Sequence, residues 1–151
     1  MDAIQLLKQE HEKATQMFSQ IQQASSEQRG QLWAKLKPEL KVHEEMEEAA
    51  LYGRIASEVG SKDEQLKAWP EAHRDEVDEA ESMIEEIDGL VPAEAAWLEK
   101  VKELHKTLAH HIEEEEGEIW PRIRHVWDSA KLEQAGIQME TIKRQKMQQA
   151  A

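Results

Sequence analysis

The chain has 151 residues, enough for one domain with a hydrophobic core, and 32 acidic against 19 basic residues give a formal net charge of −13. We therefore expect no nucleic-acid partner and no anionic membrane surface, because both select for basic patches, and the absence of cysteine excludes disulfides and thiolate sites. No apolar run approaches the roughly 20 residues of a membrane span, and the first residues, MDAIQLLKQEHEK, lack a secretion signal, which favours a cytoplasmic protein.

The composition, rich in Ala, Glu, Gln, Lys and Leu, predicts an all-α protein. The first helix is expected over about residues 3–24, with Asp2 as its N-cap. His11 fills a gap in an apolar stripe of helical spacing, formed by Ile4, Leu7, Ala14, Phe18 and Ile21. A second helix should follow the break at Ser25 and Ser26.

The second helix is predicted to reach about Val59, followed by a turn over residues 60–63. One face carries His43 and Glu47 within an otherwise apolar stripe of Leu32, Leu36, Leu40 and Leu51. Pro38 should kink or restart this helix, because its ring displaces a backbone hydrogen bond.

A third helix is predicted over residues 64–88, with Pro70 near its start and Gly89 and Pro92 after its end. Here a histidine, His73, interrupts an apolar stripe formed by Leu66, Trp69, Val77, Ala80, Ile84 and Ile87.

The fourth helix should break near Pro121, and its stripe consists of Trp97, Val101, Leu104, Leu108, His111, Glu115 and Ile119. Four amphipathic helices with short connections predict an antiparallel up-down-up-down four-helix bundle over residues 1–127. Residues 128–151 are predicted to form a weaker helix or a frayed tail, with a solvated face of Lys143, Arg144 and Lys146.

The sequence contains an internal repeat. The segment HEEMEEAALY (43–52) aligns with HIEEEEGEIW (111–120), and EHEKATQMFSQI (10–21) resembles AHRDEVDEAESMI (72–84). The chain therefore reads as two helical hairpins, each contributing a lone histidine and a His-x-x-x-Glu pair.

Residues four apart on a helix share a face, so His111 and Glu115 should point inward together, as should His43 and Glu47. The neighbouring glutamates of the run, Glu113, Glu114 and Glu116, are then expected to be solvated.

Four histidines and two glutamates are thus predicted to converge inside the bundle. Buried carboxylates cost several kcal/mol unless they are compensated, and cations between them would compensate them. Imidazole and carboxylate without thiolate suit iron or manganese better than a structural zinc site. The alternative is a hydrogen-bonded layer of histidine and glutamate without metal.

The order His, His-x-x-x-Glu, His, His-x-x-x-Glu resembles the hemerythrin-like (HHE cation-binding) family over about residues 1–127. The resemblance implies a non-haem di-iron centre with an oxo or hydroxo bridge, and dioxygen as the usual external ligand. It also implies the ligand set, with His11 and His43 on one iron, His73 and His111 on the other, and Glu47 and Glu115 bridging the two.

The chain departs from oxygen-storing hemerythrins, which carry a further histidine where this chain has Val77 and end in His-x-x-x-x-Asp. It is closer to the six-ligand branch, which includes iron-sensing, nitric-oxide-reactive and peroxide-reactive members. The departure predicts an open position on the second iron, available to azide or another small ligand, and argues against stable oxygen carriage. A peroxide- or nitric-oxide-consuming enzyme, or an iron sensor or donor, are the alternative functions.

Several neighbours leave alternatives open. His110 could replace His111 as a ligand, although the repeat favours His111, and Glu76 is either an added ligand or surface charge. Tyr52 could form a hydrogen bond near the first iron or be a ligand of it. Its repeat partner Trp120 cannot bind a metal, which favours a packing role for both aromatic residues. His105 and His125 are predicted to be solvated. An apolar wall over the metal pair is predicted from Leu51, Leu104, Leu108, Ile119 and Val77.

Overall fold

The computed structural model describes residues 1–150, which contain helices and no strand, as the composition predicts. The helices are α1 (Ala3–Gln23), α2 (Ser26–Glu47), α3 (Gly53–Val59), α4 (Glu64–Asp88), α5 (Ala95–Glu114), α6 (Trp120–Val126) and α7 (Ser129–Ala150). Two π-helical segments, η1 (Glu48–Tyr52) and η3 (Glu115–Ile119), and a short 3₁₀ helix, η2 (Gly60–Lys62), join some of them.

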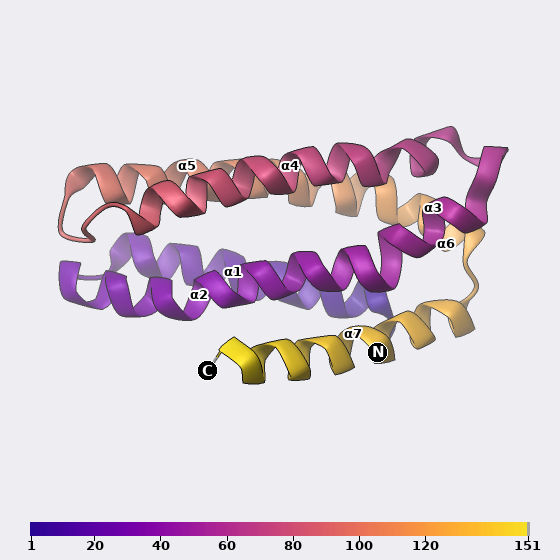
Figure 1. Cartoon of the computed structure of the whole chain (residues 1–151), viewed down its shortest axis with the longest axis horizontal. Helices are drawn as coiled ribbons and strands as arrows, with labels where there is room; N and C mark the ends of the chain where they lie inside the picture. Colours follow the sequence, from indigo (N-terminus) through magenta and orange to yellow (C-terminus); the bar gives the residue numbers. More distant parts are fainter. Residues whose placement is uncertain (151) are drawn as a thin grey trace.

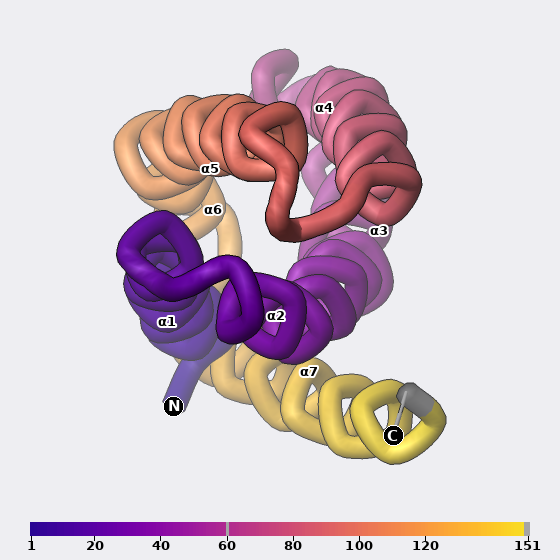
Figure 2. The backbone as a smooth tube through the Cα atoms, turned by 90° about the vertical axis from the view of Figure 1, so that its left-hand side faces the viewer, coloured from indigo at the N-terminus to yellow at the C-terminus, as the bar shows by residue number. Residues whose placement is uncertain are grey.

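The predicted antiparallel bundle is confirmed. Helices α1 and α2 form one hairpin and α4 and α5 form the other, and the two hairpins lie against each other along the long axis (Figure 1). Seen from its end, the bundle has these four helices around a common centre, and α7 lies outside them along α1 and α2 (Figure 2). No helix in the described residues is long and apolar enough to cross a membrane.

Side chains cap the starts of three long helices. Asp2 and Gln5 form a capping box, in which the Gln5 N–H donates to Asp2 Oδ1 (2.9 Å) and the Asp2 N–H donates to Gln5 Oε1 (3.1 Å). The Ser25 side chain caps α2 by accepting from the Gln28 N–H, and the Asp63 side chain caps α4 by accepting from the Leu66 N–H. These bonds satisfy backbone donors that a helix leaves unpaired at its first turn.

The chain stays helical past Pro38 and Pro121, two prolines that the sequence predicts to disturb the helices. Helix α2 is continuous through Pro38, so the helix does not restart there. Pro121 lies in the first turn of α6, where its missing N–H is tolerated, and the break comes instead at Trp127. The π segment before Pro121 supplies this new start, because its wider turn ends with the Trp120 N–H donating to the Glu115 carbonyl.

One π segment begins directly after the glutamate of its His-x-x-x-Glu pair and the other begins at that glutamate, so the sequence repeat is also a repeat of this uncommon helix geometry. Gly53 holds the same place in the first copy that Pro121 holds in the second. A Cβ at Gly53 would lie 2.7 Å from the Glu48 carbonyl oxygen, so glycine is required where the first π turn closes.

The hydrophobic core is divided into two clusters. The larger one joins both π segments, α3, α6 and α7 to the N-terminal half of α1, the end of α2 and the start of α4, and includes Leu7, Met46, Ile55, Leu66 and Ile123. The other fills the opposite end of the bundle and includes Phe18, Ile21, Leu36, Ile84, Ile87 and Trp97. Most of the predicted stripe is buried, whereas Leu32, Leu40 and Leu108 are only partly covered.

The C-terminal segment is an ordered helix and not a frayed tail. Leu132, Ala135 and Met139 of α7 are almost fully buried and belong to the larger core cluster. The predicted solvated face is wrong for Lys143, which is half-buried and bonds the carboxylate of Glu10 on α1. Arg144 is exposed, as predicted.

The crossing of α7 over the N-terminus of α1 requires a glycine. A Cβ at Gly136 would lie 2.6 Å from the Met1 carbonyl oxygen and 3.1 Å from the Ala3 nitrogen. We expect Gly136→Ala to lower the free energy of unfolding by roughly 1–3 kcal/mol, because these are backbone atoms that cannot turn aside. Urea unfolding measures the change.

Gly117→Ala is the matched control, since nothing lies within 4 Å of its added Cβ. Alanine favours helix over glycine by about 1 kcal/mol, so this variant should be neutral or stabilising. A Gly136→Ala protein as stable as the Gly117→Ala protein would contradict the close crossing.

Candidate metal centre

The six residues singled out by the sequence meet in one buried layer between the two core clusters. They come from four helices and a π segment: His11 (α1), His43 and Glu47 (α2), His73 (α4), His111 (α5) and Glu115 (η3). None of the six is more than 9% exposed. The bundle therefore concentrates four imidazoles and two carboxylates where a protein of this size ordinarily places apolar side chains.

The donor atoms fall into two groups that share one carboxylate. One group consists of His11, His43, Glu47 and Glu115, and the other of Glu44, Glu47, His73 and His111, with all ligand atoms of a group within 4.8 Å of one another. Between the helices, His11 Nε2 lies 3.6 Å from Glu115, and His73 Nε2 lies 3.4 Å from Glu47. Two adjacent cation positions bridged by a carboxylate fit this arrangement.

Three of the histidines are oriented by a carboxylate on their outer nitrogen. The Nδ1 atom of His11 contacts Glu116 at 3.1 Å, that of His43 contacts Glu10 at 3.1 Å, and that of His111 contacts Glu76. Such contacts fix a ring and leave its Nε2 free to bind a metal.

Glu116 and Glu76 correct two expectations. Glu116 was predicted to be solvated, and Glu76 to be a ligand or surface charge, but each instead contacts a buried histidine from outside the layer. His110 is 74% exposed as a side chain and pairs with Glu114, which is only partly exposed, so His111 is the inward histidine.

Glu10 and Glu44 are two functional neighbours that the sequence pattern did not predict. Glu10 directly precedes the inward-facing His11, and Glu44 directly follows the inward-facing His43. Glu116 likewise directly follows an inward-facing residue, Glu115. Neighbours along a helix are turned by about 100°, so a residue beside an inward one lies at the contact with the next helix. A carboxylate at that position reaches the neighbouring helix's histidine, and this is the signal that could have found them.

Tyr52 and Trp120, the aromatic pair of the repeat, form a hydrogen-bond chain to the layer. The Trp120 indole N–H donates to the Tyr52 hydroxyl oxygen (3.0 Å), and the Tyr52 O–H donates to Glu115. Tyr52 was expected near the first iron's histidines, but its ring lies against His73 at 4.7 Å, and it is Trp120 that stacks on His11. The pair thus does more than pack.

We expect Tyr52→Phe to keep the fold and lower the free energy of unfolding by about 1–3 kcal/mol, because the buried Trp120 N–H would lose its acceptor. Guanidinium unfolding of the metal-free protein measures the loss. Replacing both residues with phenylalanine is the control, since the double variant leaves no indole donor unpaired. Equal destabilisation by the single and double variants would show that the hydrogen bonds between Trp120, Tyr52 and Glu115 contribute nothing beyond packing.

The layer has a strongly perturbed charge balance without a cation. Burial opposes charge on His73, but its contacts with Glu44 and Glu47 outweigh burial and raise its pKa to about 10. Likewise, Glu115 and Glu76 overcome burial and raise the pKa of His111 to about 12. Burial and the nearby Glu47 raise the pKa of Glu115 to about 8. Protons therefore hold the places that metal cations could take.

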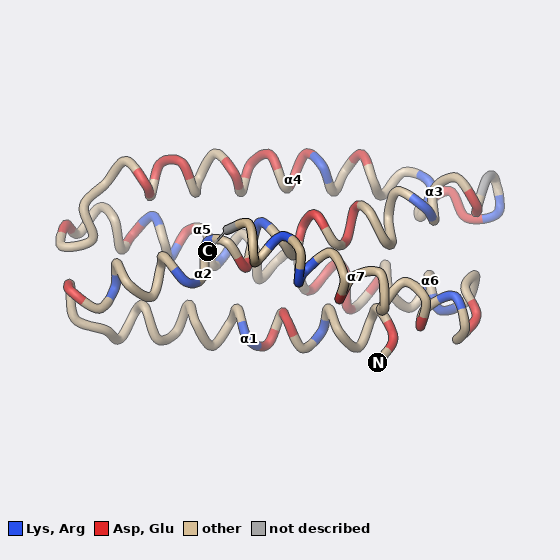
Figure 3. Tube along the Cα trace, turned by 60° about the horizontal axis from the view of Figure 1, so that its bottom comes forward, with Lys and Arg blue, Asp and Glu red and all other residues tan. Residues whose placement is uncertain are grey.

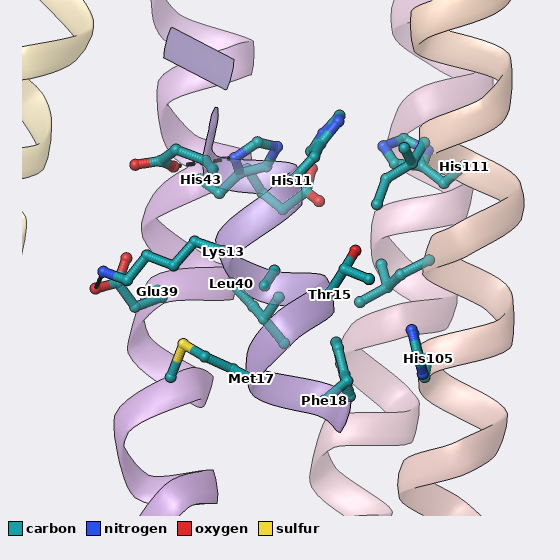
Figure 4. A pocket seen from close by; sticks show the side chains of 15 residues that line it. His11, Lys13, Thr15, Met17, Phe18, Glu39, Leu40, His43, His105 and His111 are labelled. Carbon is teal, nitrogen blue, oxygen red and sulfur yellow. Dashed lines mark hydrogen bonds and ion pairs between the residues drawn. The ribbon is translucent and has the colours of Figure 1, made fainter. Parts of the chain in front are cut away.

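A small cavity of about 40 Å³ adjoins the layer between α1, α2 and α5. His11, His43 and His111 stand at one end, and Phe18 and His105 stand at the other (Figure 4). His105 was expected to be solvated, but it is half-buried, stacks on Phe18 at 4.7 Å, and has its pKa lowered by burial.

The remaining neighbours largely follow prediction. His125 is exposed. Leu51 and Ile119 are fully buried beside the layer in the larger cluster, and Leu104 is buried in the other. Val77 is only partly buried, and it lines a groove outside the layer.

Comparison with known proteins points to one family. Residues 2–123 match the family model of the hemerythrin HHE cation binding domain. A crystallised hemerythrin HHE cation binding domain-containing protein from Mycobacterium kansasii superimposes with a TM-score of 0.80, at 22% sequence identity, over 97% of this chain and 87% of that chain. A protein named DNA nickase from Nostoc sp. (strain PCC 7120) is 27% identical over 144 residues, which cover 95% of this chain but only 39% of that protein.

Proposed function

Because this chain belongs to the hemerythrin HHE cation-binding family, we propose that it is a non-haem di-iron protein that binds dioxygen or another small ligand. The proposed ligands of the iron pair are His11, His43, Glu47, His73, His111 and Glu115. Peroxide and nitric oxide are the other small ligands of the same proposal, and turnover of either would make the protein an enzyme.

One observation carries the proposal. The Nε2 atoms of all four histidines, both oxygens of Glu47 and one oxygen of Glu115 are buried without a hydrogen bond among the described residues. Each such group costs about 1–3 kcal/mol, and more when it is charged. Several of these atoms lie within ion-pair distance but not in hydrogen-bond geometry. Cations between them satisfy the whole set at once.

The donor set favours iron over zinc. Four imidazoles and two carboxylates without a thiolate suit iron or manganese, and a structural zinc site ordinarily has only four ligands. Bound there, the iron pair would supply electrons to dioxygen or a similar ligand. The chain itself holds the histidines in place through Glu10, Glu76 and Glu116 and keeps the Tyr52 hydroxyl proton directed at Glu115.

The cavity beside the layer supports a small external ligand. Its volume of about 40 Å³ exceeds the roughly 10–15 Å³ that one water requires, so two or three atoms fit. Phe18 and Leu108 give it apolar lining away from His11 and His43, and its small volume favours an uncharged diatomic molecule over a phosphate or a sugar.

The nicking activity named for the Nostoc protein is not carried over to this chain. The chain spans only 39% of that protein, and its net charge is −13. Acidic residues recur along α4 (Figure 3). Such a surface repels phosphate, so we expect no nucleic-acid partner.

Anaerobic loading with ferrous iron tests the proposal. We expect two irons per chain after desalting, and weaker binding as the pH falls, because the imidazoles that hold protons in the metal-free layer must release them. Metal analysis gives the count, and near-ultraviolet and visible absorbance after air exposure reports oxidation. A protein that retains no iron, or one tight zinc, would refute the proposal.

A further inference from the structure

Helix α7 places one lysine against a carboxylate that contacts a histidine of the metal layer. The Lys143 ammonium bonds one oxygen of Glu10, and the other oxygen of Glu10 lies 3.1 Å from His43 Nδ1. Three helices take part, because Glu10 belongs to α1, His43 to α2 and Lys143 to α7. Lys143 is therefore linked to the metal layer through a single carboxylate.

Glu10 differs from the other outer carboxylates in how little water reaches it. Its side chain is 11% exposed, whereas those of Glu116 and Glu76 are 29% and 30% exposed. Neither Glu116 nor Glu76 pairs with a lysine or an arginine in the described part of the chain. Water can solvate those two carboxylates, but a buried carboxylate is costly without a nearby cation. Lys143 supplies that cation to Glu10.

The packing of α7 holds Lys143 at this position. Lys143 lies one turn after Met139, which has no exposed surface, and α7 runs alongside α1 and α2 (Figure 2). Glu39 of α2 is a second partner of the ammonium, at 3.6 Å. Burial opposes charge on Lys143, but Glu10 and Glu39 outweigh burial and raise its pKa. The lysine therefore meets Glu10 as a cation.

We propose that Lys143 is a positioning residue of the metal centre, which keeps Glu10 on His43 and so couples the docking of α7 to iron binding. The inference rests on the proposed function and goes beyond it, because it gives the C-terminal helix a role. An outer carboxylate fixes the ring of a ligating histidine and raises the basicity of its other nitrogen. His43 has this support in full only while α7 is docked.

The coupling acts in both directions. Where docked α7 raises the affinity for iron, bound iron stabilises docked α7 by the same factor. The docked helix buries Leu132, Ala135 and Met139, so its release would uncover apolar surface. Iron occupancy thus sets how firmly the C-terminal helix is held.

A double-mutant cycle in the full chain tests the role of Lys143. Lys143→Met removes the charge and keeps an unbranched side chain, and Glu10→Gln removes the carboxylate that the lysine bonds. The metal-free proteins are titrated anaerobically with ferrous iron against a chromophoric chelator. We expect each single variant to weaken one of the two irons by about 10- to 100-fold, the effect of outer partners of a metal. The double variant should bind iron as Glu10→Gln does, because Lys143 acts through Glu10.

Two further variants separate this role from a general charge effect. Lys143→Arg keeps a cation beside Glu10 and should restore the affinity of wild type. Lys146→Met makes the same charge change one turn later on α7, on an exposed side chain that lies 3.5 Å from Glu45. It should bind both irons as wild type does.

Hydrogen exchange measures the coupling in the opposite direction. Iron should slow the exchange of α7 amides in wild type by about the factor that Lys143 contributes to iron affinity. In Lys143→Met the effect of iron on α7 should be smaller. Exchange of α7 that iron leaves unchanged in wild type would overturn the coupling.

The iron titrations also distinguish failure of this inference from failure of the proposed function. Equal iron affinities of wild type and Lys143→Met would overturn the role of Lys143 and leave the proposed function standing. A loss from Lys143→Met that persists undiminished in the Glu10→Gln background would do the same, as would a variant whose only defect is a less stable metal-free form. A wild type that binds no iron would overturn both.

Discussion

Replacing Glu47 with glutamine should remove both irons from the protein. Glu47 is fully buried and is the only residue shared by the two groups of donor atoms among the described residues. Glutamine keeps the volume but lacks the negative charge that a bridging ligand supplies to two cations. The loss of affinity should exceed about 100-fold, the upper end of the effect of outer partners. Metal analysis after anaerobic ferrous loading and desalting measures it.

The metal-free Glu47→Gln protein should still fold. The charge of Glu47 adds to burial in raising the pKa of Glu115, so its removal relieves a repulsion within the layer. Circular dichroism and thermal unfolding of the metal-free variant provide this control. Glu113→Gln, a change of one exposed carboxylate in the acidic run, should keep both irons. Retention of two irons by Glu47→Gln would show that Glu47 does not bridge them.

Truncating Met139 to alanine should cost about 2–5 kcal/mol of folding free energy, as for other large core side chains. Met139 lies on α7 and has no exposed surface, and it packs in the cluster that contains both π segments. Helix α7 therefore stabilises the end of the bundle in which the His-x-x-x-Glu pairs terminate. The midpoint of urea unfolding reports the change.

Ile137→Ala is the matched control, two residues away on the same helix and 64% exposed. A surface change of this kind ordinarily stays within about 0.5 kcal/mol. Equal effects of the two substitutions would mean that α7 does not dock in solution as it does in the structure. The iron content of Met139→Ala then shows whether docking also influences the layer, through Lys143 and Glu10.

The sequence by itself determined the helices and the inward-facing polar residues. Hydrophobic periodicity places side chains on one face of a helix, and this face is a local property that does not depend on the partner. The internal repeat added the register, because His43 and His111 occupy equal places in the two hairpins. It separated His111 from His110, which the structure leaves exposed. The starts of three helices are also set by local interactions, because the side chains of Asp2, Ser25 and Asp63 bond backbone groups within one turn.

Only the tertiary structure decided the surroundings of the layer. The contacts of Glu10, Glu44, Glu76 and Glu116 cross from one helix to another. They depend on how far apart the helices lie and how they are rotated, which no local pattern encodes. Helical periodicity assigns such boundary positions to solvent, and in this chain a neighbouring helix covers them.

The same reason explains α7 and the prolines. The apolar stripe of α7 is weak in the sequence alone. The sequence also predicts Lys143 to be a solvated surface charge, because its partner Glu10 lies on α1, far away in the sequence. Pro121 predicts a break only if the preceding turn is an ordinary α turn, and the π segment removes that condition. Local sequence thus fixed which face each helix buries, and long-range packing fixed which polar groups meet across those faces.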